Sequence, residues 1–133
     1  MDLGITGRTA LVTASSKGLG RASAEALAAE GAKVVICARH GEELFAARDE
    51  IARKTGADID AKTADVTDPA DIKGLVDFTV QRFGGLDILV SNAGGPPPGS
   101  FEGFSDDDWL EAWNLNGMST VRLIREALPH MRK

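Results

Sequence analysis

Two glycines, two serines and a lysine lie together in the stretch TASSKGLG, residues 13–20, where they could bind an anion. The stretch follows a short apolar run, residues 9–12, and precedes an alanine-rich amphipathic one that begins at Arg21. Glycines let a backbone approach a bound group, serine hydroxyls can donate hydrogen bonds, and the lysine adds positive charge. If a strand ends and a helix begins here, free N–H groups of the helix also face the ligand. The stretch predicts a phosphate site; a turn with glycines for geometry alone is the alternative.

The overall composition sets limits on the kind of protein. The 133 residues, 43% of them hydrophobic and 26% charged, predict one domain spanning residues 1–133. A net charge of −5 without a basic stripe argues against nucleic acid. The single cysteine and two histidines do not have the spacing of a metal site, so we expect no metal. No apolar run reaches membrane-span length and no leader is recognisable, which predicts a cytoplasmic protein without membrane contact.

The apolar pattern predicts strands and helices in alternation. Helix 21–30 is expected to bury Ala22, Ala26 and Ala29, and Asp68 and Ser105 are expected to cap the last two helices. This order predicts an α/β fold of the three-layer Rossmann type: a doubly wound parallel sheet, βαβαβαβα, that ends after the fourth strand and its following helix. The expected strands are 9–12, 33–38, 58–64 and 86–90, and the expected helices are 21–30, 42–54, 69–83 and 105–132.

Four motifs in this order resemble the short-chain dehydrogenase/reductase family. Residues 13–20 are similar to its cofactor turn TGxxxGxG, with Ala14 in place of the first glycine. Asp65-Val66 resembles the family's pair at the adenine ring, and the SNAG of residues 91–94 resembles its NNAG loop. The spacing from Trp109 and from the downstream LPHM resembles that of the family's catalytic asparagine and points to Asn116, not Asn114. The resemblance implies cofactor contacts from Thr13, Ser15, Ser16, Lys17, Gly18, Leu19, Gly20, Arg39, Asp65, Val66, Asn92, Ala93 and Gly94.

The alanine at position 14 has a conformational consequence. If the turn needs a positive φ there, the methyl group of alanine costs about 1 kcal/mol or more relative to glycine. The alternative is a slightly shifted turn that does not require this dihedral angle.

The nature of the cofactor can be predicted from charge. In a doubly wound fold the end of the second strand meets the adenosine ribose, where an acid binds the 2′-hydroxyl and a cation binds a 2′-phosphate. The strand here ends in CARH, which offers Arg39 and no acid, and Lys17 approaches from the glycine turn. These two cations predict NADP over NAD. A solvated surface role for Arg39 is the alternative.

The expected reaction is hydride transfer between nicotinamide and a ketone or secondary alcohol. The family resemblance implies a catalytic serine, and a tyrosine followed four residues later by a lysine, yet the 133 residues contain no tyrosine. We therefore expect this chain to be the cofactor-binding half of such an oxidoreductase, inactive alone and similar to the 3-oxoacyl-(acyl-carrier-protein) reductase branch. A non-catalytic nucleotide-binding or scaffold domain is the alternative.

Several remaining features predict packing and association. Residues 86–90 are expected to form a long apolar edge strand, and the helix 105–132 to lack a partner, which together predict a homo-oligomer through that helix. Trp109 and Trp113 are expected in the core or at this helix interface. Cys37 is expected to be an inert core thiol, and the prolines at 96–98 to shape the rim of the cleft.

Overall fold

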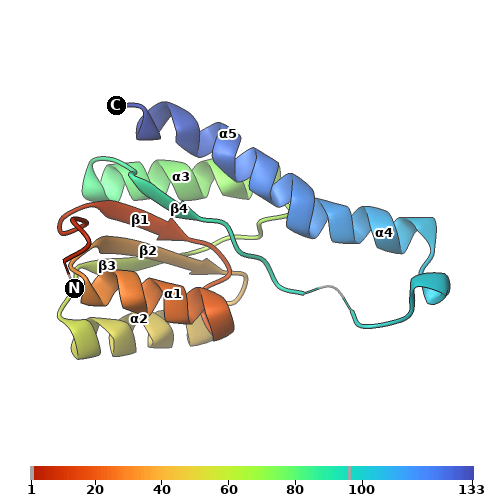
Figure 1. Cartoon of the computed structure of the whole chain (residues 1–133), viewed down its shortest axis with the longest axis horizontal. Helices are drawn as coiled ribbons and strands as arrows, with labels where there is room; N and C mark the ends of the chain where they lie inside the picture. The colour runs from red at the N-terminus through yellow and green to blue at the C-terminus, as the bar shows by residue number, and fades with distance from the viewer. Residues whose placement is uncertain (1, 96) are drawn as a thin grey trace.

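Four parallel strands form the centre of the computed structural model, which describes residues 2–95 and 97–133. The strands are β1 (Thr9–Val12), β2 (Lys33–Ala38), β3 (Ile59–Thr63) and β4 (Ile88–Val90), and they lie in the order β3-β2-β1-β4. Helices α1 (Gly18–Ala29) and α2 (Gly41–Thr55) cover one face, while α3 (Pro69–Phe83) and α5 (Ser119–Met131) cover the other (Figure 1). The expected three-layer, doubly wound α/β fold is confirmed.

Strands β1 and β2 contribute to two separate cores because their side chains alternate between the two faces of the sheet. Ala10 and Val12 of β1 pack into the core beneath α1 and α2. Leu11, which lies between them, packs into the opposite core with Leu75 of α3 and Ala127 of α5. Burial on both faces explains why β1 and β2 are nearly continuous apolar runs. In β3, by contrast, Asp60 and Lys62 alternate with the apolar residues, and this strand contributes to the first core only.

Helix α1 packs through a different face from the one expected. The structure buries Gly20, Ala24 and Ala28, spaced four residues apart, and leaves Ala22, Ala26 and Ala29 exposed. The helix also begins at Gly18, earlier than expected. In an alanine-rich segment several faces have similar hydrophobicity. The choice depends on which face has side chains small enough to approach the sheet.

Local capping sequences define the starts of α3 and of the helix that follows the loop after β4. Asp68 accepts a hydrogen bond from the N–H of Ala70 with Pro69 at the first turn of α3, and Gly84 ends this helix in the left-handed conformation. At the start of α4 (Asp106–Trp113), Ser105 and Asp108 form a reciprocal capping box. Both expected caps are therefore present.

The expected single helix 105–132 is interrupted by one π-helical turn, η2 (Asn114–Met118), between α4 and α5. A short 3₁₀ helix, η1 (Phe101–Gly103), precedes it in the loop that carries the chain away from the sheet (Figure 1). Trp109 and Trp113 are 49% and 58% exposed, so the prediction that they might belong to the core is wrong. The Trp113 indole instead lies against Gly117, where an added Cβ would come within 2.3 Å of the ring.

The edge strand β4 differs from the expected apolar edge. It contains three residues only, and Leu86, expected in the strand, is buried in the core below α3 and α5. The carboxylate of Asp87 accepts a hydrogen bond of 2.8 Å from the N–H of Thr9, while the N–H of Asp87 donates to the Thr9 carbonyl at 2.9 Å, just before the strand begins. The exposed apolar edge is thus shorter than the sequence pattern indicates.

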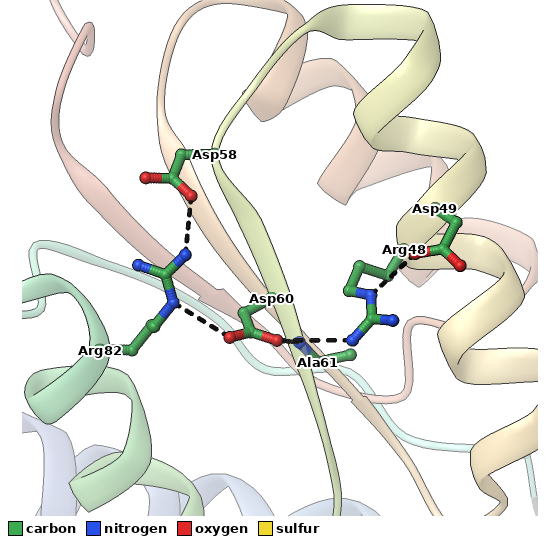
Figure 2. Close-up of polar contacts among 6 residues, drawn as sticks. All are labelled: Arg48, Asp49, Asp58, Asp60, Ala61 and Arg82. Atoms are coloured by element: carbon green, nitrogen blue, oxygen red, sulfur yellow. Dashed lines mark hydrogen bonds and ion pairs between the residues drawn. The ribbon is translucent and has the colours of Figure 1, made fainter.

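The opposite edge, β3, is covered by charged side chains. Arg82 of α3 binds Asp58 at 2.9 Å and Asp60 at 3.0 Å, and Arg48 of α2 lies 3.7 Å from the second oxygen of Asp60 (Figure 2). These pairs connect β3 to a helix on each face of the sheet. Charges along an edge strand also oppose pairing with a further strand.

Within residues 2–95 and 97–133, no helix combines the length and the apolar character that crossing a bilayer requires. The same residues contain no group of three histidine, cysteine, aspartate or glutamate side chains arranged to hold a metal ion.

Candidate nucleotide-binding site

A cavity of about 680 Å³ opens at the carboxyl ends of the strands, between the glycine turn and the loop that follows β4. Because all four strands are parallel, the loops that follow them meet at this edge of the sheet. The sequence-predicted residues in its wall are Ser16, Lys17, Gly18, Leu19, Arg39, Asp65, Val66, Asn92, Ala93 and Gly94. Residues far apart in the chain are therefore brought together as expected.

The glycine turn adopts the strained conformation considered for position 14. Ala14 has a φ of 48°, and in the described residues it is the one non-glycine residue with positive φ. Gly18, with a φ of 62°, provides the second left-handed position of the turn, at the start of α1. The turn thus follows the geometry expected of a glycine at position 14 although alanine occupies it.

The Ser15 side chain supports the turn from behind. It is fully buried, and its Oγ donates to the carbonyl of Val12 at 2.6 Å and accepts from the N–H of Cys37 at 3.0 Å. Burial raises the pKa of the Cys37 thiol to about 11, so this thiol stays protonated at neutral pH. Ser15 therefore joins β1 to β2 and does not lie in the cavity wall.

Thr13 and Asn92 hold the glycine turn against the loop after β4. The Thr13 Oγ1 donates to the carbonyl of Asn92 at 2.6 Å and accepts from its N–H at 2.8 Å. The amide Nδ2 of Asn92 donates to the carbonyl of Ala14 at 3.1 Å. Gly20 lies directly behind this contact, because a Cβ built there would be 2.2 Å from the Ala14 carbonyl oxygen. Thr13 and Gly20, like Ser15, thus lie behind the wall.

We expect the substitution Ala14→Gly to raise the free energy of unfolding by about 1 kcal/mol, because glycine removes the Cβ strain at positive φ. Urea denaturation followed by circular dichroism measures the change. The same substitution at the exposed helical Ala22 is the matched control and should lower stability by about 0.5–1 kcal/mol. A loss of stability in both variants would show that Ala14 is unstrained.

The cavity combines charges of both signs in its wall. Lys17 and Arg39 line it, and in the part of the chain that the structure describes neither has a carboxylate within 4.0 Å. His40 and Glu43, which the sequence analysis did not select, line the same cavity. Glu43, in the first turn of α2, therefore adds to the cavity wall an acid that the end of β2 does not supply.

Asp65 is held ionised by its own turn. Its Oδ1 accepts from the hydroxyl of Thr67 at 2.6 Å and from the N–H of the same residue at 2.9 Å. These hydrogen bonds, with a smaller contribution from the charge of Arg39, lower the pKa of the Asp65 carboxyl below its usual value. The carboxylate is thus a fixed negative charge and an available acceptor for an adenine amino group.

The π-helical turn places the two candidate asparagines differently. Asn114 lines the cavity and its Oδ1 accepts from Arg122 at 2.7 Å. Asn116 is exposed and does not belong to the lining residues; its Nδ2 donates to the carbonyl of Ala112 at 3.1 Å. The Asn116 carbonyl accepts from Thr120, whose hydroxyl is 2.9 Å from that of Ser91 in the SNAG loop. A catalytic role for Asn116 stays a prediction.

The cavity also contains residues that sequence reasoning missed. His40 directly follows the selected Arg39, so its position was a signal available in the sequence. Glu111 lies on α4, and no pattern connected it with the glycine turn. The complete set of additional lining residues is Ala14, Ala38, His40, Glu43, Ala64, Thr67, Gly95, Glu111, Asn114 and Leu115.

A second, more apolar cavity of about 390 Å³ adjoins the first and shares Gly95, Glu111 and Leu115 with it. Phe104 and Trp109 contribute aromatic rings to its wall, with ring centroids 6.5 Å apart. Pro97 also lines it, in agreement with the expected rim of prolines, while Pro96 lies outside the described residues.

The similarity to known proteins is extensive. The chain is 41% identical over 119 residues to a putative ketoacyl reductase of the granaticin polyketide synthase from Streptomyces violaceoruber, covering 90% of this chain and 43% of that protein. The L-sorbose reductase of Gluconobacter frateurii, solved with NADPH and L-sorbose, superposes with a TM-score of 0.93 at 39% identity, over 99% of this chain and 50% of the reductase. An NADH-dependent reductase solved with NAD gives a TM-score of 0.89 at 32% identity, covering 99% and 55%.

The chain thus spans about half the length of the curated relatives it matches. The family model described as short chain dehydrogenase matches residues 8–133, which include all four strands and the complete cavity. The match agrees with the resemblance seen in the sequence motifs and with the strand order of the sheet. The chain therefore belongs to the short chain dehydrogenase family.

Proposed function

We propose that this chain binds NADP as the cofactor half of an oxidoreductase that transfers a hydride between nicotinamide and a ketone or secondary alcohol. The observation that carries the proposal is the cavity at the strand ends, where Lys17 and Arg39 stand without carboxylate partners among the described residues. Cations without an ion-pair partner in that part of the chain, Arg39 directly after β2 and Lys17 directly before α1, fit a 2′-phosphate better than they fit a ribose hydroxyl.

The remaining features of the cavity fit the other parts of this cofactor. The turn at Gly18 presents backbone N–H groups at the start of α1, which suits a pyrophosphate. The ionised Asp65 and the adjacent Val66 suit an adenine ring. Bound nicotinamide would supply or accept the hydride, and the residues of this chain would hold the adenosine and pyrophosphate that anchor it.

The substrate is proposed as a small ketone or alcohol, with a 3-oxoacyl thioester as one form. The apolar second cavity next to the cofactor cleft supports an organic group with apolar surface. Similarity to a putative ketoacyl reductase and to L-sorbose reductase supports a carbonyl substrate in both cases. Asn116 is the proposed catalytic residue of this half.

The second candidate is a nucleotide-binding domain without catalysis, favoured by the position of Asn116, which is exposed and does not line the cavity. We also propose a cytoplasmic homo-oligomer. Its contact would be the exposed apolar side of α4 and α5, which includes Leu110, Trp113, Val121, Ile124 and Leu128.

We expect Arg39→Ala to weaken binding of adenosine 2′,5′-bisphosphate by about 1.5 kcal/mol, roughly tenfold, since Arg39 is exposed and its charged hydrogen bond is partly screened. Calorimetric titration of this chain measures the effect. Binding of 5′-AMP, which has no 2′-phosphate, is expected to stay unchanged. Equal loss for both nucleotides would place Arg39 in the fold and not at the 2′-phosphate, and bisphosphate binding no tighter than that of 5′-AMP would contradict the choice of NADP.

A further inference from the structure

The second cavity, of about 390 Å³, lies against α4, a helix that extends with its preceding loop beyond the sheet (Figure 1). A site of this volume can hold a small organic molecule. Its lining residues come from that loop, from α4 and from the π-helical turn: Gly95, Pro97, Phe104, Asp108, Trp109, Glu111, Ala112 and Leu115. The polar chemistry of this wall therefore differs from that of the first cavity, which contains both lysine and arginine.

Aromatic rings form one part of the wall. The Trp109 indole contacts the ring of Phe104, with centroids 6.5 Å apart and planes at 84°. It also contacts Phe101, which is not a lining residue, with centroids 5.3 Å apart. Gly99 lets the loop close over Phe104, because an added Cβ there would lie 2.5 Å from the ring. These contacts hold the indole in place while 49% of Trp109 stays exposed, and tryptophan has the ring that attracts a cation most strongly.

The charged groups of the same wall are both carboxylates. Among the residues that the structure describes, no lysine, arginine or histidine lines this cavity, and no basic side chain lies within 4.0 Å of Glu111. Asp108 accepts from the N–H of Ser105 through Oδ2 as part of the capping box. An acid in the first turn of a helix stabilises the helix dipole, but Glu111 lies in the second turn of α4, where this effect has faded. The charge of Glu111 is therefore available to a ligand.

We propose that the second cavity binds an organic cation, with an ammonium group between Glu111 and the Trp109 ring and an apolar body against Ala112 and Leu115. A cation is attracted by the carboxylates and by the aromatic face, whereas a neutral molecule gains apolar contact alone and an anion is repelled. For the oxidoreductase, and resting on the function proposed for it above, this charge pattern selects an amino ketone or amino alcohol as substrate over a thioester whose carrier bears phosphates.

Three ligands with the same phenylpropyl body separate the effect of charge from that of apolar contact: 3-phenylpropylammonium, 3-phenylpropan-1-ol and 3-phenylpropanoate. Each is titrated at neutral pH into the isotope-labelled 133-residue chain while NMR follows the two indole N–H resonances. We expect the ammonium ligand to bind about tenfold more tightly than the alcohol, and the carboxylate to bind most weakly. The resonance of Trp109 should shift, and that of Trp113, which does not line the cavity, should stay unchanged.

Glu111→Gln keeps the size of the side chain and removes its charge. This variant is expected to bind the ammonium ligand about threefold more weakly than wild type and the alcohol equally well, which also shows that the variant is folded. Asp107→Asn is the matched control, because Asp107 is exposed on the same helix and lines neither cavity. It should bind all three ligands as wild type does.

Equal affinity for the ammonium ligand and the alcohol would overturn the proposal, as would equal effects of Glu111→Gln and Asp107→Asn. Displacement of the ammonium ligand by saturating adenosine 2′,5′-bisphosphate would place it in the first cavity and overturn the assignment as well. A chain that prefers the ammonium ligand at Trp109 but does not bind the bisphosphate supports the cation site and overturns the proposed cofactor, and with it the substrate class.

Discussion

No oxidation of NADPH above the uncatalysed rate is expected when the 133-residue chain is mixed with ketones or β-ketoacyl thioesters. Hydride addition to a carbonyl leaves an alkoxide that must be protonated as it forms, and a positioned acid contributes typically ~10²–10⁴ in rate. The family resemblance assigns this acid to a tyrosine, and these 133 residues contain none. The exposed amide of Asn116, which already donates to Ala112, cannot supply the proton.

A loss of positioning adds to the loss of the acid. The groups expected to hold adenosine and pyrophosphate line the cavity, and they come from the loops after β1, β2, β3 and β4. Without further walls on the β4 side, nicotinamide and carbonyl would not be held in contact, and correct orientation is itself a large part of enzymatic rate. The rate factor lost with the acid and the rate factor lost with positioning multiply.

The measurement is the absorbance of NADPH during incubation with a panel of ketones, beside a titration with adenosine 2′,5′-bisphosphate that shows the chain to be folded and able to bind. Turnover by a preparation whose mass matches the 133 residues alone would contradict the expectation. A folded chain that fails to bind the nucleotide would contradict the assignment of the cavity.

Gly20→Ala is expected to lower the free energy of unfolding by about 3 kcal/mol, at the upper end of the cost of overpacking. The new methyl group would lie 2.2 Å from the Ala14 carbonyl oxygen and 2.8 Å from Nδ2 of Asn92. These atoms are hydrogen-bonded to one another, and Thr13 ties Asn92 to β1. Relief of the clash therefore requires the turn and the loop after β4 to separate, so nucleotide binding should weaken as well.

Gly74→Ala in α3 is the matched control. Gly74 is also helical, but nothing lies within 4 Å of its built Cβ and its φ is not positive. Alanine there should raise stability by about 0.5–1 kcal/mol, because it lowers the entropy of the unfolded chain and favours the helix. Urea denaturation of both variants measures the sign of each change in the free energy of unfolding. Similar small stability changes in both variants would show that the turn next to Gly20 can move to accommodate the methyl group without a loss of stability.

The sequence predicted best the elements whose signals are local. The strands β1 and β2 have the expected bounds, because continuous apolar runs there stand between clear helix signals. The caps at Asp68 and Ser105 also depend on a few adjacent residues. The inward face of α1 could not be predicted, since alanines occur on all sides of it and the close contact at Gly20 involves Asn92, far along the chain.

The candidate site shows the same division. Motif residues such as Lys17, Arg39 and Asp65 were predicted to gather at one place, and they line one cavity. Glu43 was not predicted, because its contribution depends on how the first turn of α2 is oriented above the strand end. The π-helical turn was also not predicted: a single extra residue in a helix changes no amphipathic pattern strongly, yet it decides whether Asn114 or Asn116 faces the cavity.

The central position of β1 affects the order in which the chain can fold. Strand β2 pairs with one side of β1 and follows it in the chain after one helix. Strand β4 pairs with the other side of β1, but three helices and two strands separate it from β1 in the chain. Closing a longer loop costs more entropy, so we expect β1, β2 and β3 to assemble first with α1 and α2. Until β4 arrives, the open side of β1 is an unpaired edge. The hydrogen bonds of Thr13 and Asn92, which complete the cavity, would then be among the last to form.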